Sequence, residues 1–144
     1  MGRPSPQEEA RSQAHSVTIV LDSGALTALA GDRAKLDALR RRGVWPPLVP
    51  TVVLTESLTS DHRRDFHVNR LLRACEVRIV DELLARRAAS LRFAVGRQHV
   101  PSAVDAIVVA LADDTGGATV LTSDTRDLRA LSRHTANDVP VERA

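Results

Sequence analysis

The stretch "TIVLDSGALTALA", residues 18–30, contains the pattern that decides the fold. The apolar, β-branched run over residues 16–22 predicts a short buried strand. Asp22 ends that run, and the small residues after it predict a helix that stops at Gly31. Asp22 then lies just past a strand, where it can cap the next helix or hold a ligand.

The rest of the chain repeats this alternation of short apolar strands and helices. Further strands are predicted at 48–50, 76–80 and 118–122, with a last edge strand in 139–144. Helices are predicted over residues 33–43, 52–60 (capped by Thr51), 63–75, 81–97, 103–114 and 124–134. This order predicts an α/β domain with a parallel sheet covered on both faces. Right-handed crossovers then place the carboxyl ends of all strands at one edge, where such folds bind ligands.

Length and composition point to one cytoplasmic domain. The 144 residues, 43% of them hydrophobic, suffice for a single core, which we assign to residues 16–144. Residues 1–15 are polar, lack the apolar segment of a secretion signal, and are predicted to be a disordered extension. The single cysteine excludes an internal disulfide and fits a reducing cytosol. The apolar runs are too short for a membrane span.

The positive charge is carried almost entirely by arginine. The formal net charge is only +2, yet the pI is about 9.4, because Lys35 is the only lysine. Arginine keeps its charge at any working pH and binds phosphate with two parallel hydrogen bonds. Aromatic residues are 2% of the chain, so any RNA contact is expected to use phosphate more than base stacking. Candidate RNA contacts, which could equally form solvated helix faces, are Arg40, Arg41, Arg42, Arg63 and Arg64.

Four acidic residues follow the predicted strands or open the helices after them. They are Asp22, Glu56, Asp105 and Asp124. Taken singly, each aspartate has a capping explanation: Asp22 as an N-cap, Asp105 in a capping box with Ser102, and Asp124 in a similar pattern with Asp127. Glu56 lies too far into its helix to cap it, and its neighbours Val52 and Val53 place it near the core-facing side.

The four acids together predict a metal site. Carboxylates gathered at one edge repel each other, and a divalent cation neutralises such a cluster. Carboxylate oxygens without cysteine, and with five histidines at no ligand-like spacing, suit Mg²⁺ or Mn²⁺ better than zinc. A metal held in this way can activate a water and stabilise charge on a phosphodiester, so an acidic centre with arginine flanks indicates a nuclease.

At these residues the chain resembles the PIN-domain proteins, and most closely the VapC toxins of bacterial toxin–antitoxin modules. The resemblance covers about residues 17–141. It rests on "VLDSGAL" around Asp22, "PTVVLTES" around Glu56, "SAVDAIVVALA" around Asp105 and "VLTSDTRDL" around Asp124. Each motif is weak alone, and their order and spacing together are more specific.

The resemblance implies a three-layer α/β/α fold, a homodimer, and a Mg²⁺- or Mn²⁺-dependent ribonuclease that cuts structured RNA such as tRNA or rRNA. It also implies a cognate antitoxin that binds and inhibits the enzyme. Asp22 and Asp105 would be the main metal ligands, Asp124 would complete the site directly or through water, and Glu56 would orient water or a second metal. Ser23, Thr122 and Ser123 would support the site. Asp127 is a possible fifth acid, or a charge that stabilises its helix N-terminus.

Two departures and three alternatives accompany this interpretation. The N-terminal extension is longer than in the family, and Leu128 stands where many members carry an aromatic residue. A haloacid-dehalogenase-type phosphatase would need an acid at Gly24, and a receiver domain would need a late lysine. A PIN module without catalytic activity, which binds RNA or a protein partner, is the remaining alternative.

Overall fold

The computed structural model describes residues 2–3, 5–7 and 18–144, and its centre is a sheet of five parallel strands. The strand order is β3-β2-β1-β4-β5, and every neighbouring pair is parallel. The strands are β1 (Ile19–Leu21), β2 (Leu48–Pro50), β3 (Glu76–Arg78), β4 (Thr119–Thr122) and β5 (Val141–Arg143). The prediction of an α/β fold with a short parallel sheet is confirmed.

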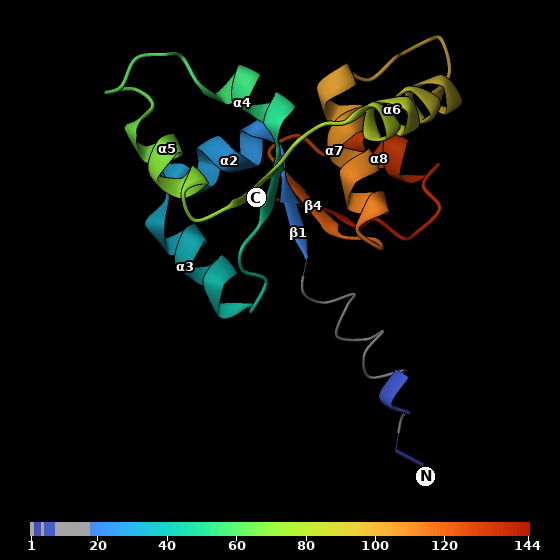
Figure 1. The fold of residues 1–144 in the computed structure, drawn as a ribbon, viewed down its shortest axis with the longest axis horizontal. Coiled ribbons are helices and arrows are strands. Elements are labelled where there is room, and N and C mark those ends of the chain that lie inside the picture. The colour runs from blue at the N-terminus through green and yellow to red at the C-terminus, as the bar shows by residue number, and fades with distance from the viewer. Residues whose placement is uncertain (1, 4, 8–17) are drawn as a thin grey trace.

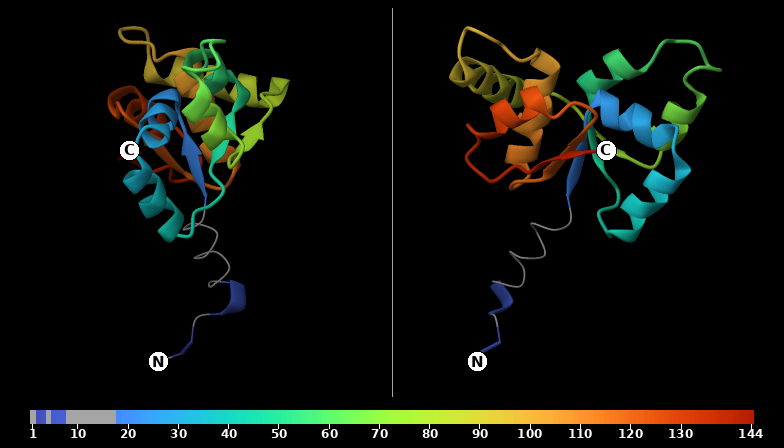
Figure 2. Two further views of the ribbon diagram at one scale, coloured as in Figure 1. Left: turned by 90° about the vertical axis from the view of Figure 1, so that its left-hand side faces the viewer. Right: turned by 180° about the vertical axis from the view of Figure 1, so that it is seen from behind.

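Helices cover both faces of this sheet, which gives the three layers seen in Figures 1 and 2. One layer holds α2 (Ser23–Ala30), α3 (Arg33–Arg41) and α5 (Phe66–Leu72), and the other holds α6 (Glu82–Val95), α7 (Ala103–Asp114) and α8 (Arg126–Ser132). The two-turn helix α4 (Thr51–Ser57) follows β2 and contacts both α2 and α7. Because all strands are parallel, their carboxyl ends lie at one edge, beside α4 and the N-termini of α2 and α7.

The core lies where β1 and α7 meet. All three residues of β1 are buried, as the continuous apolar run predicts for a strand covered on both faces. Helix α7 buries six of its residues, from Ala106 to Ala112, between the sheet and α6. The predicted bounds of this helix, 103–114, are confirmed. Asp105 is therefore carried on the best-buried helix of the domain.

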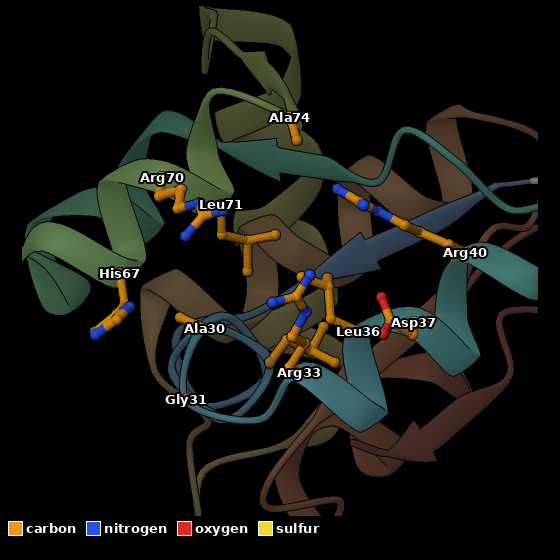
Figure 3. A pocket seen from close by; sticks show the side chains of 11 residues that line it. Ala30, Gly31, Arg33, Leu36, Asp37, Arg40, His67, Arg70, Leu71 and Ala74 are labelled. Atoms are coloured by element: carbon orange, nitrogen blue, oxygen red, sulfur yellow. The ribbon is translucent and has the colours of Figure 1, made fainter.

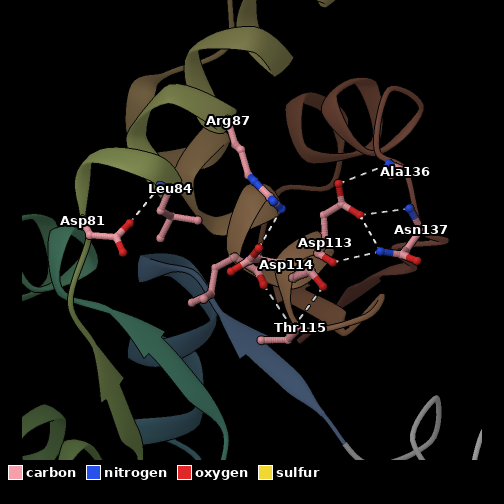
Figure 4. A network of polar contacts seen from close by, with 10 residues as sticks. Asp81, Leu84, Arg87, Asp113, Asp114, Thr115, Ala136 and Asn137 are labelled. Atoms are coloured by element: carbon pink, nitrogen blue, oxygen red, sulfur yellow. Dashed lines mark hydrogen bonds and ion pairs between the residues drawn. The ribbon is translucent and has the colours of Figure 1, made fainter.

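A polar network fixes the carboxyl end of α7 (Figure 4). Asp114 forms an ion pair with Arg87 of α6, in which Oδ1 of Asp114 lies 2.6 Å from Nη1 of Arg87. Asp113 accepts hydrogen bonds from the backbone nitrogens of Ala136 and Asn137. These contacts hold α7 against α6 on one side and the segment before β5 on the other. The N-terminus of the same helix, which carries Asp105, is thereby fixed relative to the sheet.

Five predicted helices are shorter than the sequence indicates, among them the helix predicted at 33–43, which ends at Arg41, and the helix predicted at 81–97, which covers Glu82–Val95. The helix predicted at 52–60 begins at Thr51 itself, with Pro50 as N-cap, so the prediction that Thr51 caps it is wrong. It ends at Ser57, and the helix predicted at 63–75 covers only Phe66–Leu72. The helix predicted at 124–134 covers Arg126–Ser132.

Asp65 explains why the chain between α4 and α5 is not helical. Its side chain is 5% exposed and accepts hydrogen bonds from the backbone nitrogens of Thr59 and Ser60 and from the Thr59 hydroxyl. The carboxylate is buried, which alone would raise its pKa, but these hydrogen bonds outweigh burial and lower the pKa. The backbone at Thr59 and Ser60 is thus folded around one carboxylate, a local structure that competes with helix.

Two further predictions concern the ends of the chain and the membrane. The disordered extension predicted for residues 1–15 falls mostly on positions outside the described residues, and the division into an extension and one domain over 16–144 stays a prediction. Among the helices of the described part, none combines the length and apolar character needed to cross a membrane.

Candidate active site

Asp22 occupies the centre of the carboxyl edge. It follows β1 directly and caps α2, because its Oδ1 accepts a 2.8 Å hydrogen bond from the backbone nitrogen of Ala25. Its Oδ2 accepts a short hydrogen bond from the hydroxyl of Thr122, at the end of the neighbouring strand β4. The side chain is only 7% exposed, and burial is the main reason its pKa is raised. The hydrogen bonds act in the opposite direction and favour the charged form.

Thr122 connects Asp22 to Asp124. Its Oγ1 donates its one proton to Asp22 and accepts a 3.0 Å hydrogen bond from the backbone nitrogen of Asp124. The exposed side chain of Asp124 accepts from the backbone nitrogen of Arg126 at 3.2 Å. Helix α8 has Thr125 as N-cap without a side-chain hydrogen bond, so the predicted capping pattern of Asp124 with Asp127 is not formed. The charge of Asp124 still adds to the raised pKa of Asp22.

Gly24 permits the close approach of α2 to β4. A Cβ atom at this position would overlap the hydroxyl of Ser123, and would lie 3.0 Å from the Ser123 Cβ and 3.3 Å from its backbone nitrogen. The first turn of α2, which begins at Ser23, therefore packs directly on the residue between Thr122 and Asp124. This contact sets the spacing of the Asp22 and Asp124 backbones, a role that the sequence alone did not reveal.

Asp105 faces the same edge from α7. Ser102 is the N-cap of this helix and accepts a 3.0 Å hydrogen bond from the Asp105 nitrogen, which confirms the predicted cap. Burial raises the pKa of Asp105 to about 6, against the hydrogen bond from Ser102 that lowers it. The charges of Asp22, Asp127 and Glu56 raise the Asp105 pKa further. The charges of acids from three other parts of the fold therefore act on the Asp105 carboxylate.

Glu56 differs from its prediction. Its side chain is exposed, so the expectation that it lies near the core-facing side is wrong. Helix α4 ends at Ser57, one residue after Glu56, and no further turn covers the carboxylate. Glu56 still acts on Asp105 through its charge, and its exposed carboxylate is accessible to a ligand held there.

Asp127, in the first turn of α8, has a partner that the sequence did not indicate. The ring nitrogen Nε2 of His99 lies 2.8 Å from its Oδ1, although the two residues are 28 positions apart. Histidine spacing in the sequence predicts ordinary surface or core residues, and no local signal distinguishes His99 from the other four.

Three of the five candidate arginines have partners other than the four acids. Arg42 pairs with Glu142 of β5, Arg64 pairs weakly with Asp61, and Arg40 lies over the ring of Trp45. Arg40 also lines a separate pocket of about 390 Å³ between α2, α3 and α5, together with Arg33 and Arg70 (Figure 3). The prediction that Arg40, Arg41, Arg42, Arg63 and Arg64 contact RNA is not tested by these positions and stays a prediction.

The donor set fits a hard divalent cation. Within the described residues, Asp22, Glu56, Asp105 and Asp124 form no ion pair with a basic side chain. In the same part of the chain, no group of three or more acidic, histidine or cysteine side chains is arranged closely enough to enclose a metal. Mg²⁺ does not require such a cage, because it is usually held by one or two carboxylates and keeps several waters. Two mutually repelling carboxylates without a cation partner, at Asp22 and Asp105, match that requirement.

Comparison with known families agrees with this geometry. The sequence profile described as "PIN domain" matches residues 19–133, which span all four acids. The chain belongs to the PIN domain family. No curated protein matches the sequence significantly.

Several solved structures share the fold of this PIN domain. VapBC2 from Rickettsia felis, bound to a DNA fragment from their promoter, aligns with a TM-score of 0.65 and 13% identity, covering 89% of this chain and 99% of that one. VapBC from Salmonella typhimurium, also DNA-bound, aligns with a TM-score of 0.64 and 16% identity, and the alignment covers 88% of this chain and 98% of that one. VapBC-1 from nontypeable Haemophilus influenzae aligns with a TM-score of 0.64 and 13% identity, and the alignment covers 88% of this chain and 98% of that one. At these identities the likeness concerns the fold.

Proposed function

We propose that this PIN domain is a Mg²⁺- or Mn²⁺-dependent endoribonuclease and the toxin of a toxin–antitoxin pair. The observation that carries the proposal is the convergence of Asp22 and Asp105, on different elements, at the carboxyl edge of the sheet with no basic partner among the described residues. Burial and mutual repulsion make this arrangement unfavourable for the folded chain by itself, and a divalent cation relieves it.

Asp22 and Asp105 would hold the metal, with Asp124 completing the site directly or through water. A bound Mg²⁺ or Mn²⁺ supplies an activated water and offsets charge that develops on the phosphodiester. Thr122 and the Ala25 nitrogen orient the Asp22 carboxylate, and Ser102 orients Asp105. The exposed Glu56 would orient water on the open side of the site.

The partners are proposed from the similar structures and from charge. These structures are VapBC complexes, some of them on DNA, which supports an antitoxin partner for this chain as well. An arginine-rich surface with a pI of about 9.4 supports an RNA substrate held through phosphate. We further propose a homodimer in the cytoplasm, as the resemblance to VapC implies.

Cleavage of total RNA by the purified protein tests the nuclease proposal. The wild type is incubated in Mg²⁺, Mn²⁺ or EDTA, beside Asp105→Asn and the control Asp32→Asn. Asp32 is a suitable control because it caps α3 away from the acidic edge, and asparagine caps equally well. Discrete fragments in metal that are absent in EDTA and in Asp105→Asn, but present in Asp32→Asn, support the proposal. A folded wild type that cuts no RNA in either metal would favour a binding module without catalytic activity.

A further inference from the structure

We infer that His99, held by Asp127, is a substrate-binding residue that contacts a phosphate of the RNA at the rim of the acidic edge. The inference rests on the proposed nuclease function and adds to it a basic group that neither the motifs nor the arginine runs contain. His99 lies between α6 and α7, and Asp127 lies on α8, so three elements meet at this pair.

The segment that carries His99 is fixed at its C-terminal side. Arg92 of α6 donates a 2.9 Å hydrogen bond to the carbonyl of Pro101, and Ser102 then caps α7. Helix α6 also contacts α8, on the same side of the sheet (Figure 1). The imidazole of His99 is therefore placed against Asp127 by a loop whose end is attached to the helix that carries Asp105.

The chemistry of the pair orients the ring. An ionised carboxylate only accepts hydrogen bonds, so Nε2 of His99 carries a proton and donates it to Asp127. Nδ1 is then the atom available to other molecules, and in the described part of the chain it has no hydrogen-bond partner. The His99 side chain is 61% exposed and that of Asp127 is 31% exposed, so the imidazole is the more accessible member of the pair. An imidazole that carries a proton on each nitrogen donates from both, so Nδ1 is the ring atom that would donate to a phosphate.

His99 lies beside the acidic edge, where a basic side chain can reduce the repulsion of a polyanion. Asp127 is close enough to Asp105 for its charge to act on that carboxylate, and His99 pairs with Asp127. A polyanion that approaches the carboxylates of this edge is repelled, and a cation at the rim offsets part of that repulsion. Arg92 donates its Nε to the Pro101 carbonyl, and Arg143 donates to the Ser123 carbonyl. Arg126 and Arg129 of α8 are also exposed, but among the described residues neither forms an ion pair, whereas His99 is held against Asp127.

RNA binding by charge variants of the full-length protein tests the assignment. The probe is a fluorescein-labelled, 30-nucleotide RNA of mixed sequence, titrated in EDTA at several KCl concentrations so that phosphate contacts are measured without cleavage. We expect His99→Gln to bind about 3- to 10-fold more weakly and to reduce the slope of log K against log [KCl] by about 0.7, the value of one phosphate contact on a single strand. His99→Arg, which keeps a cation, is expected to restore both.

His134→Gln is the matched control, because His134 is exposed, follows the other end of α8 and forms no ion pair in the described residues. It is expected to bind like the wild type. Equal binding and salt slope for His99→Gln and the wild type would overturn the assignment. Weaker binding that His99→Arg does not restore, together with a lower melting temperature, would mean that His99 only anchors the loop, and would also overturn it.

The cleavage assay separates this inference from the proposed function. If the wild type cuts RNA and His99→Gln cuts it with unchanged KM, the nuclease proposal stands and the role of His99 is wrong. If the wild type neither binds nor cuts RNA, both proposals are wrong. A KM raised in His99→Gln, with kcat within about twofold of the wild type, is the result expected for a phosphate contact outside the reacting atoms.

Discussion

Removing the charge of Asp105 is expected to stabilise the metal-free protein. The pKa of Asp105 is raised from 3.8 to about 6 by burial and by the charges of Asp22, Asp127 and Glu56. A shift of about two units corresponds to about 3 kcal/mol of free energy that the charged form costs the folded state. Asparagine has the same shape and can still accept the hydrogen bond from Ser102, but it carries no charge.

The direction of the pH dependence follows from the raised pKa. The folded state binds this proton more tightly than the unfolded state, so the stability contributed by protonated Asp105 is complete below about pH 4. That stability is lost as the pH rises from about 4 to about 6 and stays lost above it. In EDTA at pH 7.5, Asp105→Asn is therefore expected to be more stable than the wild type by up to about 3 kcal/mol, or up to about 10 °C in Tm. Near pH 4 the two proteins should melt together.

Thermal melts of both proteins in EDTA, from pH 4 to pH 8, measure this difference, with Asp32→Asn as the control for an exposed aspartate. Adding Mg²⁺ should then raise the Tm of the wild type and leave Asp105→Asn unchanged, because only the wild type offers the full site to the ion. If Asp105→Asn at pH 7.5 is only as stable as the wild type or less so, or if the difference does not depend on pH, then the charged Asp105 carboxylate does not destabilise the folded protein.

Three further predictions concern the residues that hold the site in place. Gly24→Ala is expected to lower both the Tm and the cleavage rate, because its Cβ overlaps the side chain of Ser123; a fully active, equally stable variant would show that α2 does not need this close approach. Thr122→Val removes the hydrogen bond that stabilises the charged form of Asp22, so the acidic limb of the activity–pH profile should move to higher pH; an unmoved profile would contradict this. Asp65→Asn is expected to cost about 1–3 kcal/mol in urea unfolding, since it replaces one of the two accepting oxygens by an NH2 group that faces an N–H donor, and removes the charge that strengthens the remaining hydrogen bonds; a change below about 0.5 kcal/mol would show that the loop does not depend on this carboxylate.

The fold could be predicted because its signals are local. A continuous apolar run such as β1 specifies a strand covered on both faces, and Ser102 with Asp105 specifies where α7 begins. Once the strands are parallel, chain connectivity alone places their carboxyl ends at one edge. Asp22, Asp105 and Asp124 could therefore be assigned to one region of the structure before any coordinate was known.

The remaining features depend on contacts between distant residues. The exposure of Glu56 follows from the early end of α4, which is determined partly by the way Asp65 folds the next segment. The pairing of His99 with Asp127 and the contact of Gly24 with Ser123 join residues on different elements, and neither has a sequence pattern. The arginines illustrate the same limit: Arg40 and Arg42 are two positions apart in one run, yet they have different partners, Trp45 and Glu142.

We propose that the acidic edge binds a divalent cation through Asp22 and Asp105. Calorimetric titration of Mn²⁺ into the wild type, Asp105→Asn, Asp22→Asn and Asp32→Asn measures that binding. We expect saturable binding to the wild type and to Asp32→Asn, and loss of that binding in both Asp105→Asn and Asp22→Asn while their folds, measured by circular dichroism, are unchanged. Saturable binding of equal affinity in all four proteins would contradict it, because the ion would then be held somewhere other than at this edge.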